Sequence, residues 1–354
     1  MTKLLEKIIS ELEFDISFYN QKSLKHKEGN IWDCFDKDFF DFIKDQKNWE
    51  NFRLNGMTCG LETGLLQSER KNILGKKLYE KNYTKEEKED IISRFEELKN
   101  MMGDVNLSSL VCSEIGNPRN TYKSGTLLNF DDLYHVYSFW QISRFLDCNK
   151  KSILEIGAGY GNLAEKFVKH TDSKYFIIDL PESILIQHYY LKTNHPEKKI
   201  QKIISSNDQI DTSNDVFLVP CFFLDSVKNT QFDLVINMRS FGEMNSIIIQ
   251  EYFNLINKTL KDDGFLYTVN RYVTYRGSEI ITFKDYPFGD YWTPIISQPQ
   301  WLQTHLHELF IRKNQNPDLP FQKILESLPN RTPPPGPIMV NYSIDDWSKT
   351  NKVK

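Results

Sequence analysis

Three glycines at alternating positions, Gly157, Gly159 and Gly161, follow directly after the apolar segment 152–156, and a helix is expected to open at Asn162. Because glycine has no Cβ, such a loop can turn sharply and bring its backbone close to a ligand. A dinucleotide fingerprint has the spacing GxGxxG, with its third glycine one position later than here. The spacing therefore predicts a ligand-binding loop that is not a pyrophosphate loop for NAD.

Two carboxylates accompany this loop. Glu155 stands two residues before the first glycine, and Asp179 ends the next β-type segment. An acid at Glu155 would repel a pyrophosphate but attract a ligand with an ammonium and a sulfonium group. An acid at the end of the second strand can accept hydrogen bonds from both hydroxyls of an adenosine ribose. Together they favour S-adenosylmethionine as cofactor; the alternatives are that Glu155 only caps the loop and Asp179 only caps the next helix.

Arginines and histidines elsewhere in the chain are weaker candidates for a site. Arg119, Arg239 and Arg271 either hold an acidic sugar or a sugar phosphate by bidentate hydrogen bonds, or lie in surface ion pairs. His305 and His307 have the spacing of a metal-ligand pair but no acidic or thiolate neighbour in the sequence. We therefore expect no metal site.

Short β-type and helical segments alternate around these residues. The expected strands are 152–156, 175–179, 216–219, 232–237, 265–270, 293–296 and 308–312. The expected helices between them are 162–169, 181–192 and 245–260, the last ending at the turn 261–264 through its glycine. This alternation predicts an α/β fold with a parallel sheet covered on both faces.

The sequence before residue 126 is mostly helical in pattern. Residues 4–19 repeat apolar side chains every three or four positions, and residues 84–102 form a second helical segment with Thr84 as its cap. The aromatic residues among 31–54 either line an acceptor surface or belong to the core. We expect a helical lid and acceptor-binding region, a cofactor-binding domain and a C-terminal extension, at residues 1–125, 126–315 and 316–354.

Composition excludes several classes of protein. The net charge of −4, with acids and bases interleaved, argues against a nucleic-acid binder. The longest apolar run, residues 216–224, is far shorter than the ~20 residues that cross a bilayer. The first residues carry charges and form no apolar signal segment. Five widely spaced cysteines without a CxxC pair suggest reduced thiols, and we expect a cytoplasmic protein.

Two strings resemble a known family. LEIGAGYG at 154–161 with IIDLPE at 177–182 is similar to class I S-adenosylmethionine-dependent methyltransferases. This resemblance implies a Rossmann-like, seven-stranded sheet that begins at residue 152. It also implies that Gly157, Gly159 and Gly161 lie along the methionine part of the cofactor, and that Asp179 holds the ribose.

One departure from the family changes the expected adenine site. Related enzymes often have an aspartate after the third strand, where this chain has Pro220, Cys221 and Phe222. The adenine would then contact backbone groups and an apolar wall. With the residues after the fourth strand, the expected cofactor contacts are Glu155, Gly157, Gly159, Gly161, Asp179, Leu180, Cys221, Phe222, Asn237 and Met238.

A narrower resemblance suggests the acceptor. The string DLPESILIQHYYL at 179–191 with RSFGEM at 239–244 resembles the bacterial sugar O-methyltransferases, and so do NW-NFR at 48–53 and GNPR at 116–119. This resemblance implies methyl transfer to a sugar hydroxyl in a surface polysaccharide or glycolipid pathway. The alternatives are a phenol or carboxylate acceptor, a protein that binds the cofactor without catalysis, and a nicotinamide enzyme with a shortened loop.

Two residues are candidates for the base that an alcohol needs before methylation. Glu243 falls where the similar plant-type O-methyltransferases carry a catalytic histidine, and its alternative is an exposed acid at a helix start. His135 lies on the helix before the first strand, and its alternative is a packed histidine. Asn237 and Met238 stand where nucleobase and glutamine N-methyltransferases carry an Asn/Asp-Pro-Pro-aromatic string, so these activities are disfavoured.

Overall fold

A computed structural model describes residues 6, 7, 10, 46–54, 82–111, 113–205, 207–276, 279–314 and 321–329. Nearly all of the expected helix over 4–19 and most of the aromatic stretch 31–54 lie outside these residues. The C-terminal extension lies outside them too, apart from its segment 321–329.

The centre of the fold is an eight-stranded mixed sheet with the order β11-β12-β8-β7-β3-β4-β6-β5. Its strands are β3 (Ser152–Ile156), β4 (Lys174–Asp179), β5 (Ile200–Lys202), β6 (Val216–Pro220), β7 (Phe232–Met238), β8 (Leu260–Arg271), β11 (Trp292–Pro299) and β12 (Leu306–Lys313). Neighbouring strands are parallel throughout the part of the sheet with the order β8-β7-β3-β4-β6-β5. β12 pairs antiparallel with β8, and β11 pairs antiparallel with β12. From β3 the chain proceeds to β4 on one side and later to β7 on the other. Ligands of such sheets bind at the carboxyl ends of the strands beside this switch point.

All seven expected strands are present, but the expected count of seven is wrong. The additional strand, β5, pairs in parallel with β6 at the edge of the sheet. It has three residues, and only Ile200 is apolar, so it carries no alternating pattern. The expected glycine ending at Gly264 is also wrong: the helix ends at Thr259, and Asp263 is the residue with a left-handed φ of +67°.

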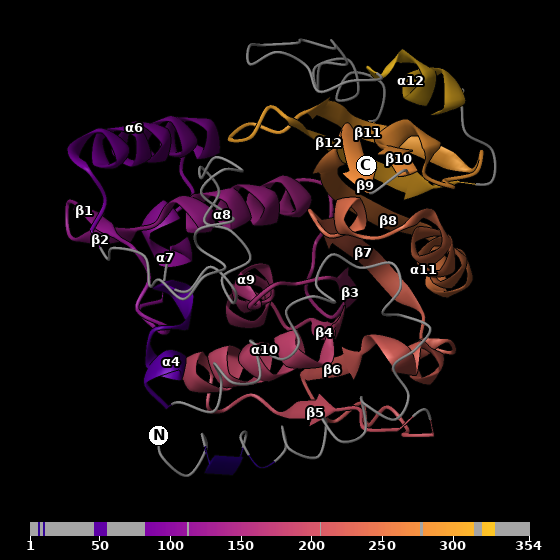
Figure 1. The fold of residues 1–354 in the computed structure, drawn as a ribbon, viewed down its shortest axis with the longest axis horizontal. Coiled ribbons are helices and arrows are strands. Elements are labelled where there is room, and N and C mark those ends of the chain that lie inside the picture. The colour runs from indigo at the N-terminus through magenta and orange to yellow at the C-terminus, as the bar shows by residue number, and fades with distance from the viewer. Residues whose placement is uncertain are drawn as a thin grey trace.

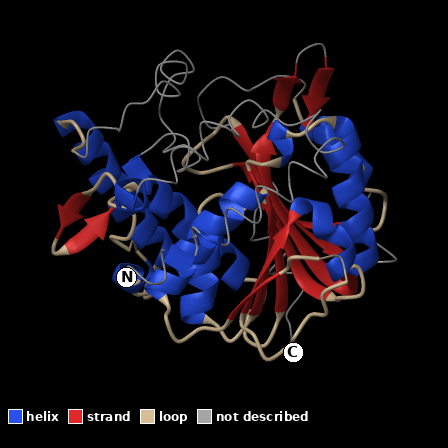
Figure 2. Ribbon diagram, turned by 60° about the horizontal axis from the view of Figure 1, so that its bottom comes forward, coloured by secondary structure: helices blue, strands red, loops and turns tan. Residues whose placement is uncertain are grey.

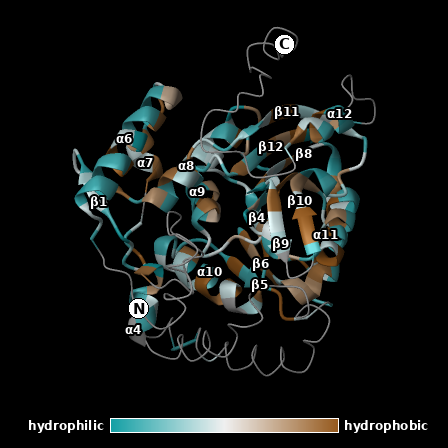
Figure 3. Ribbon diagram, turned by 45° about the horizontal axis from the view of Figure 1, so that its top comes forward, coloured by the Kyte–Doolittle hydropathy of each residue, from teal (hydrophilic) through white to brown (hydrophobic). Residues whose placement is uncertain are grey.

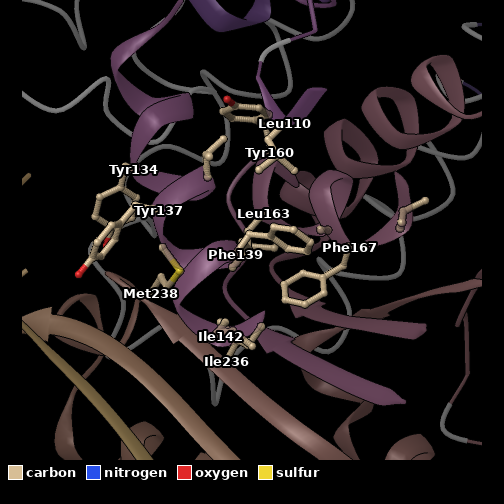
Figure 4. Packing of buried hydrophobic residues seen from close by; sticks show 14 of the residues in the cluster. Leu110, Tyr134, Tyr137, Phe139, Ile142, Tyr160, Leu163, Phe167, Ile236 and Met238 are labelled. Atoms are coloured by element: carbon tan, nitrogen blue, oxygen red, sulfur yellow. The ribbon is translucent and has the colours of Figure 1, made fainter. Parts of the chain in front are cut away.

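Helices cover both faces of the sheet, as Figure 2 shows with the sheet between two helical layers. One face is covered by α8 (Phe130–Ser143), α9 (Asn162–His170) and α10 (Pro181–Asn194), and the other by α11 (Ser246–Thr259) and α12 (Phe321–Ser327). Each face has its own apolar cluster. Figure 4 shows part of the first, where Phe139 of α8, Leu163 of α9 and Ile236 of β7 lie together.

The described N-terminal elements are α4 (Gln46–Glu50), η2 (Phe52–Leu54), α6 (Lys85–Met102), α7 (Leu107–Leu110) and the hairpin of β1 (Thr121–Lys123) and β2 (Thr126–Leu128). Thr84 caps α6 as expected, in a reciprocal capping box with Glu87. The helix lies beside α8 (Figure 1), to which it turns Ile91, Phe95 and Leu98, while its outer face is hydrophilic (Figure 3).

The remaining short elements connect the main ones: η3 (Cys221–Val227), η4 (Phe241–Glu243), η5 (Phe283–Asp285) and the hairpin of β9 (Val273–Arg276) and β10 (Glu279–Thr282). Within the described ranges, no helix is both long and apolar enough to cross a bilayer.

Candidate active site

The glycine loop after β3 forms an open bend at the carboxyl edge of the sheet. Gly157, Gly159 and Gly161 have φ angles of +75°, +59° and +94°. Residues other than glycine adopt such backbone angles only with strain. A Cβ at Gly157 would lie 2.3 Å from Oγ of Ser240, whereas a Cβ at Gly159 would meet no atom within 4 Å. The loop is therefore packed on one side and leaves space for a ligand on the other.

Asp179 connects this loop to the end of β4. Its Oδ2 accepts hydrogen bonds from the N–H of Ala158 (2.9 Å) and from Nε2 of Gln187 (2.7 Å), and its Oδ1 accepts from the N–H of Leu180 (2.8 Å). Gln187 also donates to the carbonyl of Gly159 at 2.8 Å. A carboxylate accepts about four hydrogen bonds, so Asp179 keeps room for roughly one ligand hydroxyl rather than two.

Glu155 lies in the core rather than at the open side of the loop. It is 2% exposed, and its Oε2 accepts a hydrogen bond from the hydroxyl of Tyr175 at 2.8 Å. Burial raises the pKa of Glu155 to about 8, and the nearby Asp179 adds to the rise. At neutral pH the carboxyl is therefore mostly protonated, and it offers little negative charge to a cationic ligand.

A hydrogen-bond network fixes the loop after β7 against the end of β3. Asn237 donates to the carbonyl of Ile156 at 3.0 Å and to Oγ of Ser240, and it accepts from Asn270 at 2.7 Å. Ser240 donates in turn to the carbonyl of Ile156. Asn237 is thus fully buried and shapes the site from behind, and Met238 is likewise buried in the apolar cluster next to Tyr134 and Tyr137 (Figure 4).

A charged cluster joins α8 to the glycine loop and to the loop after β7. The buried Asp131 accepts hydrogen bonds from Nη2 of Arg239 (3.0 Å) and, at its other oxygen, from the hydroxyl of Tyr160 (3.2 Å) and from Asn162 (3.4 Å). Burial opposes ionisation of Asp131, but His135 in its protonated form and the guanidinium of Arg239 lower its pKa below the usual value. Asp131 is therefore a carboxylate that holds three elements together.

Arg239 approaches this cluster from a strained backbone. Its φ is +65°, although it is not glycine, and its N–H donates to the carbonyl of Val269 at 2.7 Å. Its guanidinium lies 4.4 Å from the centre of the Tyr134 ring, a cation–π contact. Such strain is found mainly where a side chain must point in one direction, here across the glycine loop to Asp131.

The ring of His135 is oriented by contacts of its Nδ1. Its Nδ1 lies 2.8 Å from the carbonyl oxygen of Asp131 and 3.2 Å from the amide nitrogen of Asn162, which also donates to the Asp131 carboxylate. The shorter contact is to an oxygen that only accepts, so we assign the hydrogen to Nδ1 and a lone pair to Nε2. Burial lowers the pKa of His135 and Arg239 adds to this effect, although Asp131 opposes it. The imidazole is therefore neutral at pH 7, and Nε2 has no hydrogen-bond partner among the described residues.

Glu243 is half-buried at the end of η4, where its N–H donates to the carbonyl of Ser240 at 2.9 Å. Its charge reaches two residues of the site. It adds to the burial that raises the pKa of Asp179 to about 6, and, together with Asp131, it raises the pKa of Arg239 against the effect of burial. The structure thus brings Glu243 to the same edge as Asp179.

The expected apolar wall divides into an outer and an inner part. Leu180 and Phe222 are partly exposed and pack against the second apolar cluster, whereas Cys221 is buried within it. Of the three residues expected to form this wall after β6, Pro220, Cys221 and Phe222, only Phe222 is partly exposed.

The other polar candidates lie outside this constellation. Arg119 forms an ion pair with Glu87 at 2.9 Å and stacks on Tyr83. His307 is fully buried, where it contacts Ser297 and Tyr272, and burial lowers its pKa to about 3. In the part of the chain that the structure describes, no group of three His, Cys, Asp or Glu side chains is placed to hold a metal ion.

Sequence reasoning missed four residues of the site: Asp131, Tyr160, Gln187 and Ser240. Asp131 follows the helix cap Asn129, so it is indistinguishable in the sequence from an acid that favours a helix N-terminus. Gln187 stands in the middle of α10, and only the packing of this helix against the loop shows that it faces Asp179.

Comparisons with known proteins give partial matches. The family model described as the spermine/spermidine synthase domain matches residues 134–287, less than half of the chain. A search of curated proteins finds no match.

Solved structures that are similar include methyltransferases. The pyocyanin biosynthetic protein PhzM has 15% identity and a TM-score of 0.36, and the match covers 52% of this chain and only 57% of that chain. The N-methyltransferase NodS from Bradyrhizobium japonicum WM9, in complex with S-adenosyl-L-homocysteine, has 13% identity and a TM-score of 0.38, over 62% of this chain and 98% of that chain. An rRNA methylase from Streptococcus thermophilus has 16% identity and a TM-score of 0.34, over 51% and 95%.

Proposed function

We propose that this chain is a class I methyltransferase that uses S-adenosylmethionine to methylate a hydroxyl of a small molecule, with a sugar as the acceptor. The observation that carries the proposal is the open glycine bend at the switch point of the sheet, next to Asp179 and to a neutral histidine with a free lone pair. The family resemblance of LEIGAGYG and IIDLPE supports the cofactor.

The residues present fit this cofactor. The space at Gly159 accommodates its methionine part, Oδ1 of Asp179 accepts from a ribose hydroxyl, and Phe222 offers a face to the adenine. When bound, the cofactor supplies an electrophilic methyl group on a sulfonium. Since Glu155 is protonated and bonded to Tyr175, it supports the loop from below in this proposal.

The chain's own contribution to chemistry is alignment and proton removal. In methyl transfer the S–C bond breaks as the O–C bond forms, and the hydroxyl proton must leave. Nε2 of His135 accepts this proton in the proposal, and the resulting imidazolium is stabilised by Asp131. Glu243 is the second candidate, because it stands at the same edge as Asp179.

The narrower resemblance at 179–191 and 239–244 is the basis for proposing a sugar hydroxyl as the acceptor. The enzyme would act in the cytoplasm, in a pathway that makes a surface polysaccharide or a glycolipid. The net charge of −4 supports a small acceptor rather than a nucleic acid. A phenol, a carboxylate, cofactor binding without catalysis and, from the matched family model, an amine remain alternatives for the test.

Calorimetry and a methylation screen test the proposal. We expect the full chain to bind S-adenosylhomocysteine and not NAD. With labelled S-adenosylmethionine, we expect transfer to nucleotide-sugars rather than to phenols, carboxylates or polyamines. Absence of S-adenosylhomocysteine binding would refute the cofactor, and transfer to another class alone would replace the acceptor.

Substitution of the two candidate bases identifies the proton acceptor. His135→Ala should lower turnover by at least ~100-fold if His135 is the base, while affinity for S-adenosylhomocysteine changes little. Glu243→Gln tests the second candidate by the same measure. His195→Ala is the control, because His195 lies just after the C-terminal end of α10, where it pairs with Glu165 of α9. If neither candidate lowers turnover to this extent, both assignments are wrong.

A further inference from the structure

The N-terminal segment that ends in η2 packs behind the glycine loop, although it lies more than 100 positions before it in the sequence. Phe52 contacts the rings of Tyr160 and Tyr190 edge-on, at centroid distances of 5.7 and 6.1 Å. A Cβ at Gly116 would lie 2.4 Å from the Phe52 ring. The segments NW-NFR and GNPR are therefore in direct contact, at a place where no larger residue than glycine fits.

Arg53 is the charged residue of this contact. It is 2% exposed, its Nη1 donates to the carbonyl of Ser113 at 2.8 Å, and its N–H donates to the carbonyl of Gly116 at 2.9 Å. The guanidinium lies 4.9 Å from the centre of the Tyr160 ring. Burying an arginine costs free energy unless its charge is compensated by hydrogen bonds or other favourable contacts. The contact of the guanidinium with the Tyr160 ring is one such interaction, and it connects Arg53 to the glycine loop.

The contact continues into the charged cluster of the site. The hydroxyl of Tyr160 donates to Asp131, which accepts from Arg239 on its other oxygen. The charge of Arg53 also reaches Asp131. Two positively charged residues thus act on the aspartate, and Tyr160, the residue between Gly159 and Gly161, contacts both Arg53 and Asp131.

We propose that Arg53 is a positioning residue for the cofactor: it fixes Tyr160, and through it the bend of the glycine loop that receives the amino-acid end of S-adenosylmethionine. The proposal rests on the proposed function, because it assumes that the methionine part of the cofactor lies along this loop. In this proposal Asp179 and Phe222 hold the adenosine end. The N-terminal region therefore completes the cofactor site and does not only cover it.

Two ligands distinguish positioning from a general loss of structure. S-Adenosylhomocysteine has the amino-acid end, and 5′-methylthioadenosine keeps the adenosine and the sulfur without it. Arg53→Met, which retains the length of the stem but removes the charge, should weaken binding of S-adenosylhomocysteine about tenfold and change that of 5′-methylthioadenosine less than about twofold. Arg53→Lys, which restores the charge, should bind S-adenosylhomocysteine within about threefold of wild type.

Arg94→Met is the control, since Arg94 stacks on the ring of Phe130 as Arg53 does on that of Tyr160, but pairs with Asp90 outside the site. It should leave both affinities unchanged. If Arg53→Met does not fold, Tyr160→Phe provides the test, because it removes only the hydroxyl that binds Asp131 and should show the same selective loss.

Equal weakening of both ligands, or wild-type affinity for S-adenosylhomocysteine in Arg53→Met or Tyr160→Phe, would overturn the positioning role while leaving the cofactor intact. Failure of the wild-type chain to bind S-adenosylhomocysteine would instead remove the proposed function, and the positioning role with it.

Discussion

The two acids that frame the glycine loop in the sequence have different environments. Glu155 points into the apolar cluster below β3 and is bonded to Tyr175, whereas Asp179 accepts three hydrogen bonds at the edge of the sheet. Their positions along the strands explain the difference, because Asp179 is the last residue of β4, whereas Glu155 stands inside β3, before Ile156. Glu155 lies on the same face of β3 as Ile153, and this face is covered by α8 and α9.

The buried Glu155 predicts a pH dependence of stability. Its pKa of about 8 is above the usual value of 4.5, so the folded state holds this proton more tightly than the unfolded state. The contribution to stability is therefore complete below pH ~4.5 and is lost as the pH rises through about 8. Glu155→Gln should exceed the stability of wild type by about 1 kcal/mol near pH 5 and by roughly 4–5 kcal/mol at pH 8.5, measured by urea unfolding.

The exposed Glu89 provides the control for this prediction. Glu89→Gln should follow the wild-type stability at both pH values. If the difference between Glu155→Gln and wild type is the same at pH 5 and pH 8.5, Glu155 is already ionised in the folded protein.

At the scale of elements, the sequence predicts the longer strands of the main sheet and misses the short edge strand β5 and the small hairpins. The expected strand 152–156 matches β3 without error, because Ile153, Leu154 and Ile156 are fully buried. β5 and the small hairpins lack this apolar run. The loops were predictable only in part: glycine permits the positive φ angles at positions 157, 159 and 161, but that of Arg239 accompanies a hydrogen bond to β8.

The glycine loop allows a matched comparison of strain and ligand space. Gly159 (φ +59°) and Gly103 (φ +61°) have nearly equal positive φ angles, and neither would meet an atom within 4 Å through a new Cβ. Gly159→Ala and Gly103→Ala should each lower the free energy of unfolding by roughly 1 kcal/mol. Only Gly159→Ala should also weaken binding of S-adenosylhomocysteine, because only there does the ligand use the space.

Thermal or urea unfolding together with calorimetry measures both effects on the same samples. Equal affinity of the two variants for S-adenosylhomocysteine would mean that the ligand does not approach Gly159.

At the scale of the molecule, the N-terminal elements and the sheet share one core. Leu98 of α6, Trp49 of α4 and Leu133 of α8 belong to the same apolar cluster as Ile153 of β3. Trp49 contacts the ring of Tyr189 on α10 at a centroid distance of 5.2 Å. The division at residue 125 that the sequence suggests reflects a change of pattern along the chain, and such a change says nothing about which elements pack together.

This shared core predicts that residues 126–329 do not fold alone. Without residues 1–125, the apolar faces of α8 and α10 are exposed. Each large side chain of α6 or η2 that no longer packs there costs about 2–5 kcal/mol of stability. A few such losses exceed the 5–15 kcal/mol that stabilises a typical protein. The fragment should show no cooperative urea transition, a weak near-UV circular dichroism signal and strong binding of a hydrophobic dye, unlike the full chain. A cooperative fragment that binds S-adenosylhomocysteine as tightly as the full chain would show that the N-terminal region is a separable lid, and would also contradict the positioning role of Arg53.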